Sequence, residues 1–113
     1  MKLRQKELNS GIVLFEIEGD IVGGPDAMSL NDEVRKLVEG GKKKFIVDMG
    51  SVRHINSSGL GILIASLNAV RQAGGDLKVA NVSPRVIDLL KITKLNQIFE
   101  SYKSVDEAVK NLA

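Results

Sequence analysis

The segment from Phe45 to Leu67, FIVDMGSVRHINSSGLGILIASL, constrains the fold more than any other part of the chain. It opens with three consecutive apolar residues, a pattern typical of a strand buried on both faces, as in the centre of a parallel sheet. Apolar residues at helical spacing follow between Leu60 and Val70. A buried strand followed by an amphipathic helix predicts one β–α unit of an α/β protein.

The rest of the 113-residue chain continues this alternation. The apolar face of the first helix is expected to carry Met28, Leu30, Val34, Leu37 and Val38. We therefore predict a single α/β domain over 1–113, with a mixed, partly parallel sheet of four to five strands packed with about four helices. The expected strands are 3–8, 12–17, 44–48, 77–82 and a short one near 98–99; the expected helices are 25–39, 57–73, one from 84 onward and 104–112.

Composition excludes several classes of function. The chain has no Cys and one His, which rules out thiolate metal sites and disulfides and leaves no Ser/His/Asp arrangement. Metal-ligand spacing and phosphate-binding glycine motifs are also absent from the sequence. We expect no catalytic residues, no metal and no cofactor.

Charge and hydropathy indicate a protein of the aqueous phase. The formal net charge is only +2, and the run Lys42-Lys43-Lys44 has no aromatic or arginine cluster beside it, so we expect no nucleic-acid binding. The N-terminal segment is polar and lacks the apolar stretch of a secretory signal. The longest apolar-rich run, 60–67, is too short to span a bilayer. These features predict a cytoplasmic protein without membrane insertion.

The start of the second predicted helix has an unusual composition. Asn56, Ser57 and Ser58 are all favoured N-cap residues, whereas Gly59 and Gly61 each cost about 0.5–1 kcal/mol in a helix relative to Ala. Two explanations are open: tight packing of the helix start on the sheet, or close approach of a partner's backbone. A helix N-terminus would also stabilise a phosphoserine, because its free N–H groups and dipole favour negative charge.

The string VDMGSVRHINSSGLGILIASLNAVRQAGGDLKVANVSP resembles the core of the STAS domain family, the anti-sigma factor antagonists. Members carry a strand ending in Asp or Asn, a short loop, and a Ser-Gly-Leu-Gly sequence that opens a helix. Residues 19–21 (GDI) and 87–95 (IDLLKITKL) also match the family in order and position. The resemblance covers nearly the whole chain and implies a STAS-like fold.

The same resemblance implies a function. Ser57 matches the position that an anti-sigma factor with serine kinase activity phosphorylates. The unphosphorylated form would bind that kinase and free the sigma factor, and a phosphoserine phosphatase would reset the cycle. This chain has Asn56 where the family usually has Asp, and Val22 where many members have Asp. Residues expected at the partner surface are Asn56, Ser58, Gly59, His54, Gly23 and Gly24.

Two alternatives remain open at this stage. Some STAS domains are accessory or scaffold subunits of lipid transporters or signalling complexes and are not phosphorylated. A receiver-like protein would instead use Asp48, interpreted as the end of a central strand. Asp48 is better explained as a residue that fixes a loop, and His54, beside Arg53, as a solvated loop residue that lies close to the switch serine.

Overall fold

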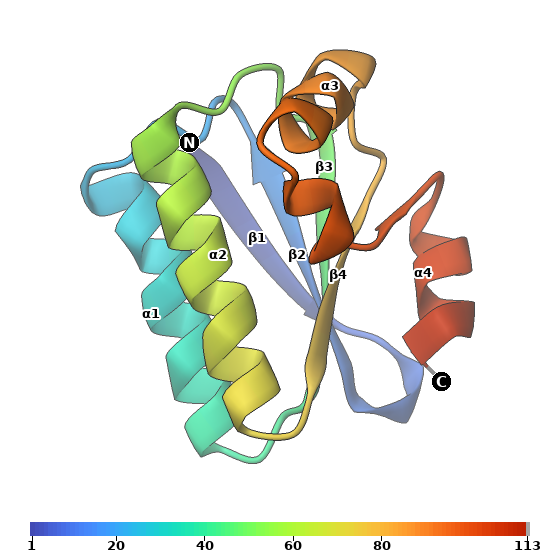
Figure 1. Ribbon diagram of the computed structural model, residues 1–113. Coiled ribbons are helices and arrows are strands. Elements are labelled where there is room, and N and C mark those ends of the chain that lie inside the picture. The colour runs from blue at the N-terminus through green and yellow to red at the C-terminus, as the bar shows by residue number, and fades with distance from the viewer. Residues whose placement is uncertain (113) are drawn as a thin grey trace.

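The computed structural model describes residues 1–112, except for the side chain of Asp26. Its strands and helices follow one another in the predicted order (Figure 1). None of the helices in this part of the chain has the length and apolar character needed to cross a membrane. The elements are β1 (Lys2–Glu7), β2 (Ile12–Glu18), α1 (Pro25–Glu39), β3 (Lys44–Ser51), α2 (Ser57–Gln72), β4 (Asp76–Ala80), α3 (Pro84–Ile92), β5 (Ser101–Tyr102) and α4 (Val105–Leu112).

The five strands form one mixed sheet in the order β1-β2-β3-β4-β5. β1 is antiparallel to β2, and the remaining neighbours are parallel. Figure 1 shows α1 and α2 side by side on one face of the sheet and α4 beyond β4 on the other. β1 is an edge strand whose side chains are mostly exposed. The predicted mixed α/β architecture is confirmed.

Two apolar clusters, one on each face of the sheet, hold the domain together. The larger lies beneath α1 and α2 and contains Phe15 and Phe45, whose rings are stacked with centroids 6.3 Å apart. The smaller lies beneath α4 and includes Ile12, Ile46 and Ala108. Because β3 contributes to both clusters, it is buried on both faces, as its apolar run predicted.

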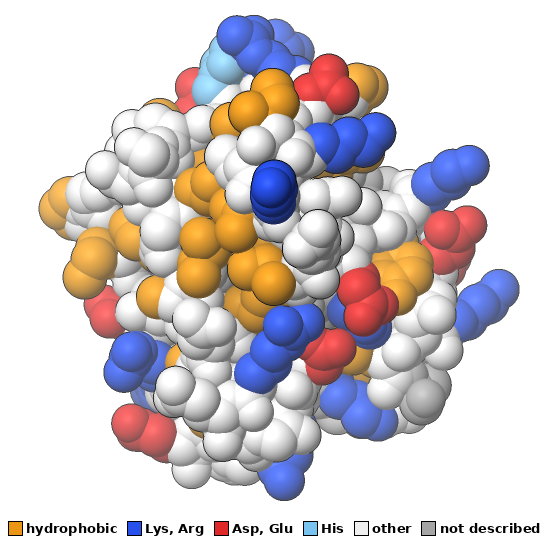
Figure 2. All heavy atoms as spheres, viewed as in Figure 1, with side chains coloured by type: hydrophobic (Ala, Val, Ile, Leu, Met, Phe, Trp, Pro, Cys, Tyr) orange, Lys and Arg blue, Asp and Glu red, His pale blue; other side chains and the backbone are white. Residues whose placement is uncertain are grey.

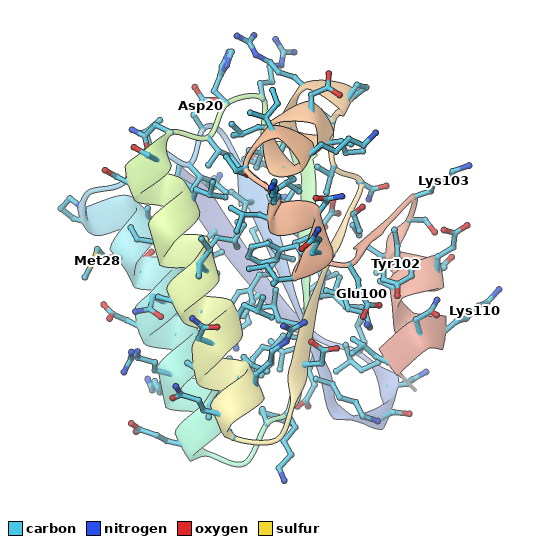
Figure 3. All side chains as sticks on the ribbon, in the orientation of Figure 1. Asp20, Met28, Glu100, Tyr102, Lys103 and Lys110 are labelled. Carbon is cyan, nitrogen blue, oxygen red and sulfur yellow. The ribbon has the colours of Figure 1, made fainter. Side chains whose placement is uncertain are left out.

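Three local predictions were wrong. Met28 is 47% exposed, because the buried stripe of α1 begins at Ala27 and the next residue lies about 100° further round the helix; Figure 3 shows the Met28 side chain pointing away from the body of the protein. β3 continues to Ser51, so Asp48 lies inside the strand and not at its end. The last strand is β5 and not 98–99, because Phe99 packs into the core first.

Candidate functional site

The β2–α1 loop and the β3–α2 loop run side by side at the carboxyl end of the parallel strands (Figure 1). The Ile21 N–H donates to the His54 carbonyl at 3.0 Å, and the Asn56 N–H donates to the Ile21 carbonyl at 3.2 Å. These bonds extend the parallel pairing of β2 and β3 beyond the strands. The start of α2 is therefore fixed to the loop that precedes α1.

Asn56 joins these two loops through its side chain. Its Oδ1 accepts from the Gly59 N–H at 2.8 Å, so Asn56 is the N-cap of α2 and the helix begins at Ser57, as predicted. Its Nδ2 donates to the Val22 carbonyl, also at 2.8 Å. An aspartate would keep the first bond and lose the second, because an ionised carboxylate has no donor.

Gly59 has a packing function. It is buried, and a methyl group added there would overlap the carbonyl of Ile21. Only glycine allows the first turn of α2 to lie directly on this backbone, which makes tight packing the correct explanation for Gly59. A methyl group on Gly61 would meet nothing within 4 Å, and nothing in the structure explains that glycine.

Ser57 and Ser58 are both exposed in the first turn of α2, so a kinase could reach either serine. Their N–H groups have no acceptor within the helix, since the first N–H groups of any α-helix lie beyond its hydrogen-bonding pattern. Gly23 lies against Ser58, because a methyl group added at Gly23 would be 2.7 Å from the Ser58 Cβ. Gly23 and Gly24 have φ values of +84° and +86°, a backbone conformation that glycine adopts at little cost.

Asp48 has a structural role that fits its interpretation as a loop-fixing residue. Its Oδ1 accepts from the Gly50 N–H at 3.0 Å and from Asn81 Nδ2 at 3.1 Å. Lys78 lies inside β4 and pairs with Glu100 and Asp76, so it is not a lysine placed after a strand, as a receiver-like mechanism would need. Among the described residues, no three His, Asp or Glu side chains are grouped as a metal ion would require.

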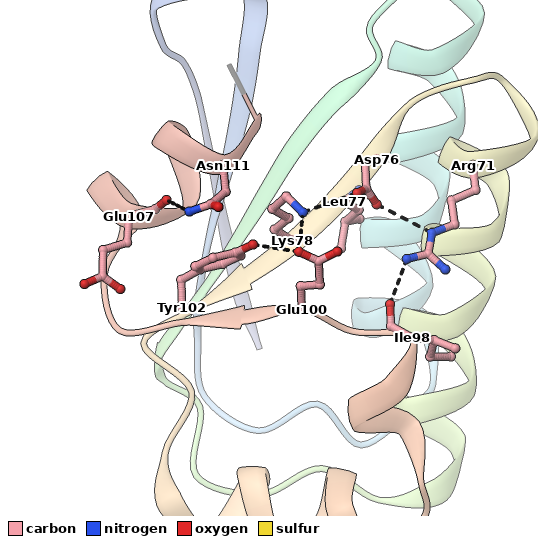
Figure 4. A network of polar contacts seen from close by, with 9 residues as sticks. All are labelled: Arg71, Asp76, Leu77, Lys78, Ile98, Glu100, Tyr102, Glu107 and Asn111. Atoms are coloured by element: carbon pink, nitrogen blue, oxygen red, sulfur yellow. Dashed lines mark hydrogen bonds and ion pairs between the residues drawn. The ribbon is translucent and has the colours of Figure 1, made fainter.

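A polar network surrounds the buried Lys78 and was missed at the sequence level (Figure 4). Lys78 Nζ donates to Glu100 Oε2 at 2.7 Å and to Asp76 Oδ2 at 3.3 Å, although the Lys78 side chain is only 5% exposed. The Tyr102 hydroxyl donates to the same Glu100 oxygen at 2.6 Å. A lysine between apolar residues of a predicted strand was the available signal.

The pKa values of these three groups are shifted by their mutual contacts. Burial alone would lower the pKa of Lys78, but the hydrogen bonds and charges of Glu100 and Asp76 outweigh it and raise that pKa. The hydrogen bonds from Lys78 and Tyr102 lower the pKa of Glu100. Donation to Glu100 raises the pKa of Tyr102. All three shifts favour the paired state Lys78⁺–Glu100⁻ with a neutral tyrosine, as expected of a structural contact.

Comparison with known proteins gives a consistent result. The STAS domain family model matches residues 4–108. The anti-sigma-B factor antagonist of Bacillus subtilis (strain 168) is 33% identical over 88 residues, covering 75% of this chain and 80% of that protein. An anti-sigma factor antagonist from Mycobacterium paratuberculosis has the same fold, with a TM-score of 0.82 at 21% identity over 98% of this chain and 92% of the other. The Bacillus cell fate determinant SpoIIAA in its phosphorylated form aligns with a TM-score of 0.77 at 13% identity, over 99% and 100% of the two chains. The chain belongs to the STAS domain family.

Proposed function

We propose that this protein is an anti-sigma factor antagonist that binds an anti-sigma factor with serine kinase activity and is switched off when Ser57 is phosphorylated. The observation that carries the proposal is the position of Ser57, exposed as the first residue of α2, in a helix start held firmly by Asn56. The 33% identity with an anti-sigma-B factor antagonist supports the same partner class.

The proposed cycle depends on charge at the start of α2. Unmodified protein binds the kinase in the cytoplasm and so releases the sigma factor for transcription. The kinase transfers the γ-phosphoryl group of ATP to Ser57 Oγ, which adds about −1.5 to −2 charges at pH 7. The N-terminus of α2 stabilises this charge within the domain, whereas a partner surface that fits the neutral serine would have to desolvate it. The chain is thus a substrate and not an enzyme, and a phosphoserine phosphatase restores binding.

The partner surface is proposed to include Asn56, Ser58, His54, Gly23 and Gly24, which lie on the two paired loops and the first turn of α2. Gly59 is buried under the Ile21 carbonyl. We therefore assign Gly59 an indirect role, in which it lets the helix start approach the loop and so shapes the surface.

The test is phosphorylation with a purified anti-sigma factor kinase and ATP, followed by mass spectrometry of the peptide that contains both serines. We expect phosphate on Ser57, none on the Ser57→Ala variant, and normal modification of the matched control Ser58→Ala. Ser57→Ala should bind the kinase like the unmodified protein. Ser57→Asp should have a lower affinity for the kinase, but the loss should be smaller than on phosphorylation, because a carboxylate carries less charge than a phosphate.

A negative result has a defined meaning. If Ser57 stays unmodified while the same kinase phosphorylates another antagonist in the same tube, the phosphorylation switch is refuted. The protein would then be assigned to the scaffold class of STAS domains, the accessory subunits of transporters or signalling complexes.

A further inference from the structure

A groove of about 300 Å³ lies next to the switch serine, between the β3–α2 loop and α3. The loop contributes Arg53, His54 and Ile55, and α3 contributes residues on the side that faces this loop. Figure 2 shows this end of the molecule at the top, where the single histidine lies beside blue basic side chains and above orange hydrophobic ones, with red acidic side chains on either side. The groove is therefore both apolar and basic.

Its apolar part includes a side chain that the fold leaves uncovered. Ile92 is 80% exposed, the highest value among the exposed large hydrophobic residues of the described chain; Val22 and Met28 reach 52% and 47%. Ile92 stands at the end of α3, and Leu89 and the buried Val86 lie one and nearly two turns before it. These three residues give the groove a continuous apolar wall.

Its basic part is made by Arg53, His54 and Arg85, which are all exposed. Within the described part of the chain, neither arginine forms an ion pair. Asp88 is the one acidic residue among those that line the groove. Two arginines against one aspartate give the lining a formal net charge of +1 with the histidine neutral, and this charge attracts carboxylates.

We infer that this groove binds a segment of the partner protein in which an apolar side chain is flanked by acidic residues. This inference rests on the proposed function, because it assigns the groove to the same kinase partner that the Ser57 surface meets. The apolar side chain packs against Leu89 and Ile92, and the flanking carboxylates face Arg53 and Arg85.

The position of the groove links it to the switch. Three peptide units separate His54 from Ser57, so their Cα atoms are at most about 11 Å apart. That distance is comparable with the Debye length of about 8–10 Å in physiological salt. A phosphate on Ser57 therefore lies close enough to this end of the groove to repel the carboxylates of an acidic segment, which adds to the loss of binding.

The groove can be tested without the kinase. The ¹⁵N-labelled protein is titrated with the acetylated and amidated hexapeptide Glu-Glu-Leu-Leu-Glu-Glu and with its Lys-Lys-Leu-Leu-Lys-Lys counterpart. We expect the acidic peptide to shift amide resonances in 53–55 and 85–92 with a millimolar dissociation constant, and the basic peptide to leave them unchanged. Equal shifts with both peptides, shifts centred elsewhere, or no shift at about 10 mM peptide, well above a millimolar dissociation constant, would overturn the inference.

Variants identify the side chains responsible. Arg85→Glu and Ile92→Ser should each raise the dissociation constant of the acidic peptide at least fivefold. Two variants serve as controls: Ile92→Met keeps the apolar surface, and Lys36→Glu changes a charge on α1, away from the groove. Both of these controls should bind like the wild type. If Arg85→Glu and Ile92→Ser also bind like the wild type, the groove is not the binding site.

The kinase then separates this inference from the proposed function. If the kinase phosphorylates Ser57 with the same KM in the wild type and in Arg85→Glu, the groove is not a docking site. The proposed function would remain intact. An expected rise in KM of fivefold or more, with kcat unchanged, supports both. If the kinase fails to bind the wild type while the acidic peptide still shifts the groove, the proposed function fails and the recognition chemistry of the groove stands.

Discussion

At the scale of single residues, the amide of Asn56 fixes the geometry of the loops in front of Ser57. One side chain caps α2 through the Gly59 N–H and bonds the carbonyl of Val22 in the neighbouring loop. Each hydrogen bond of this kind contributes about 0.5–1.5 kcal/mol to stability. An aspartate at this position would supply the cap alone, so this chain holds its β2–α1 loop by a contact that aspartate cannot make.

We expect Asn56→Asp to lower the free energy of unfolding by about 1 kcal/mol. The carboxylate would lose the donor to the Val22 carbonyl and face that oxygen with a negative charge, although it would still cap the helix. Urea denaturation at pH 7 measures the change, and Asn56→Ala is the control, with a larger loss because the cap is removed as well. A carboxylate at this N-cap also gains about 0.3–1 kcal/mol from the helix dipole, so an Asn56→Asp variant more stable than the wild type by that amount would show that the bond to Val22 contributes nothing.

The two glycines of the first helical turn form a matched pair. Gly59→Ala should destabilise the domain by about 3 kcal/mol or more, because the new methyl group overlaps the Ile21 carbonyl and the helix start must move. Gly61→Ala should instead raise stability by about 0.5–1 kcal/mol, since its methyl group meets open space and alanine favours the helix. Thermal unfolding of both variants measures the difference; equal effects would contradict the packing assigned to Gly59.

At the scale of elements, the C-terminal part of the chain is held to the sheet by few main-chain bonds. β5 pairs with β4 over only Ser101 and Tyr102. The Lys78 network supplements this pairing, and Arg71 of α2 adds a hydrogen bond to the Ile98 carbonyl at 2.9 Å (Figure 4). Side-chain contacts therefore position the segment that leads into α4.

These contacts predict how stability depends on pH. The raised pKa values of Lys78 and Tyr102 mean that their contribution is complete below about pH 10 and is lost as the pH rises through the folded-state values. The lowered pKa of Glu100 means that its contribution is present above about pH 4 and is lost as the pH falls. Because the buried ammonium of Lys78 loses its partners at low pH and its own charge at high pH, denaturation curves should show the wild type losing stability relative to Lys78→Met at both extremes of pH.

Substitutions in the network should have unequal effects. Glu100→Gln should cost about 1 kcal/mol, because it leaves a buried ammonium with a weaker acceptor, while the exposure of Glu100 to solvent limits the loss. Lys78→Met should stay within about 1 kcal/mol of the wild type, since it replaces a desolvated charge with an apolar chain of similar size. Urea denaturation at pH 7 measures the free energy of unfolding of both variants. A larger loss for Lys78→Met than for Glu100→Gln would show that the charged pair stabilises the fold more than an apolar side chain does.

At the scale of the whole molecule, local sequence patterns predicted the order and type of the elements. The apolar run of β3 and the capping residues of α2 each act within a few residues, so they are visible in the sequence. The contacts that define the site and the polar network are not local: Ile21 lies against Gly59, α3 against the β3–α2 loop, and Glu100 against Lys78. Only the assembled sheet brings those segments together. The exposed position of Met28 was missed because helical spacing alone does not fix where a buried stripe begins.

Phosphorylation should leave the whole fold intact. Because Ser57 is exposed at the N-terminus of α2, added negative charge there is favourable by about 0.3–1 kcal/mol. Ser57→Asp should therefore unfold at the same temperature as the wild type or slightly above it, while its affinity for the kinase falls. Differential scanning calorimetry of this variant and of the phosphorylated protein checks the expectation, and a drop of several degrees in either would place the effect of phosphate inside the domain.

The edge strand β1 bears on the behaviour of the protein in concentrated solution. Lys2, Arg4 and Lys6 alternate along it and share one face of the sheet. If two copies joined edge to edge with antiparallel β1 strands and the same faces together, these cations would stand opposite one another at about 5 Å. The resulting repulsion disfavours this exposed edge as a template for aggregation, although the ion pairs of Arg4 with Glu18 and of Lys6 with Glu16 reduce it.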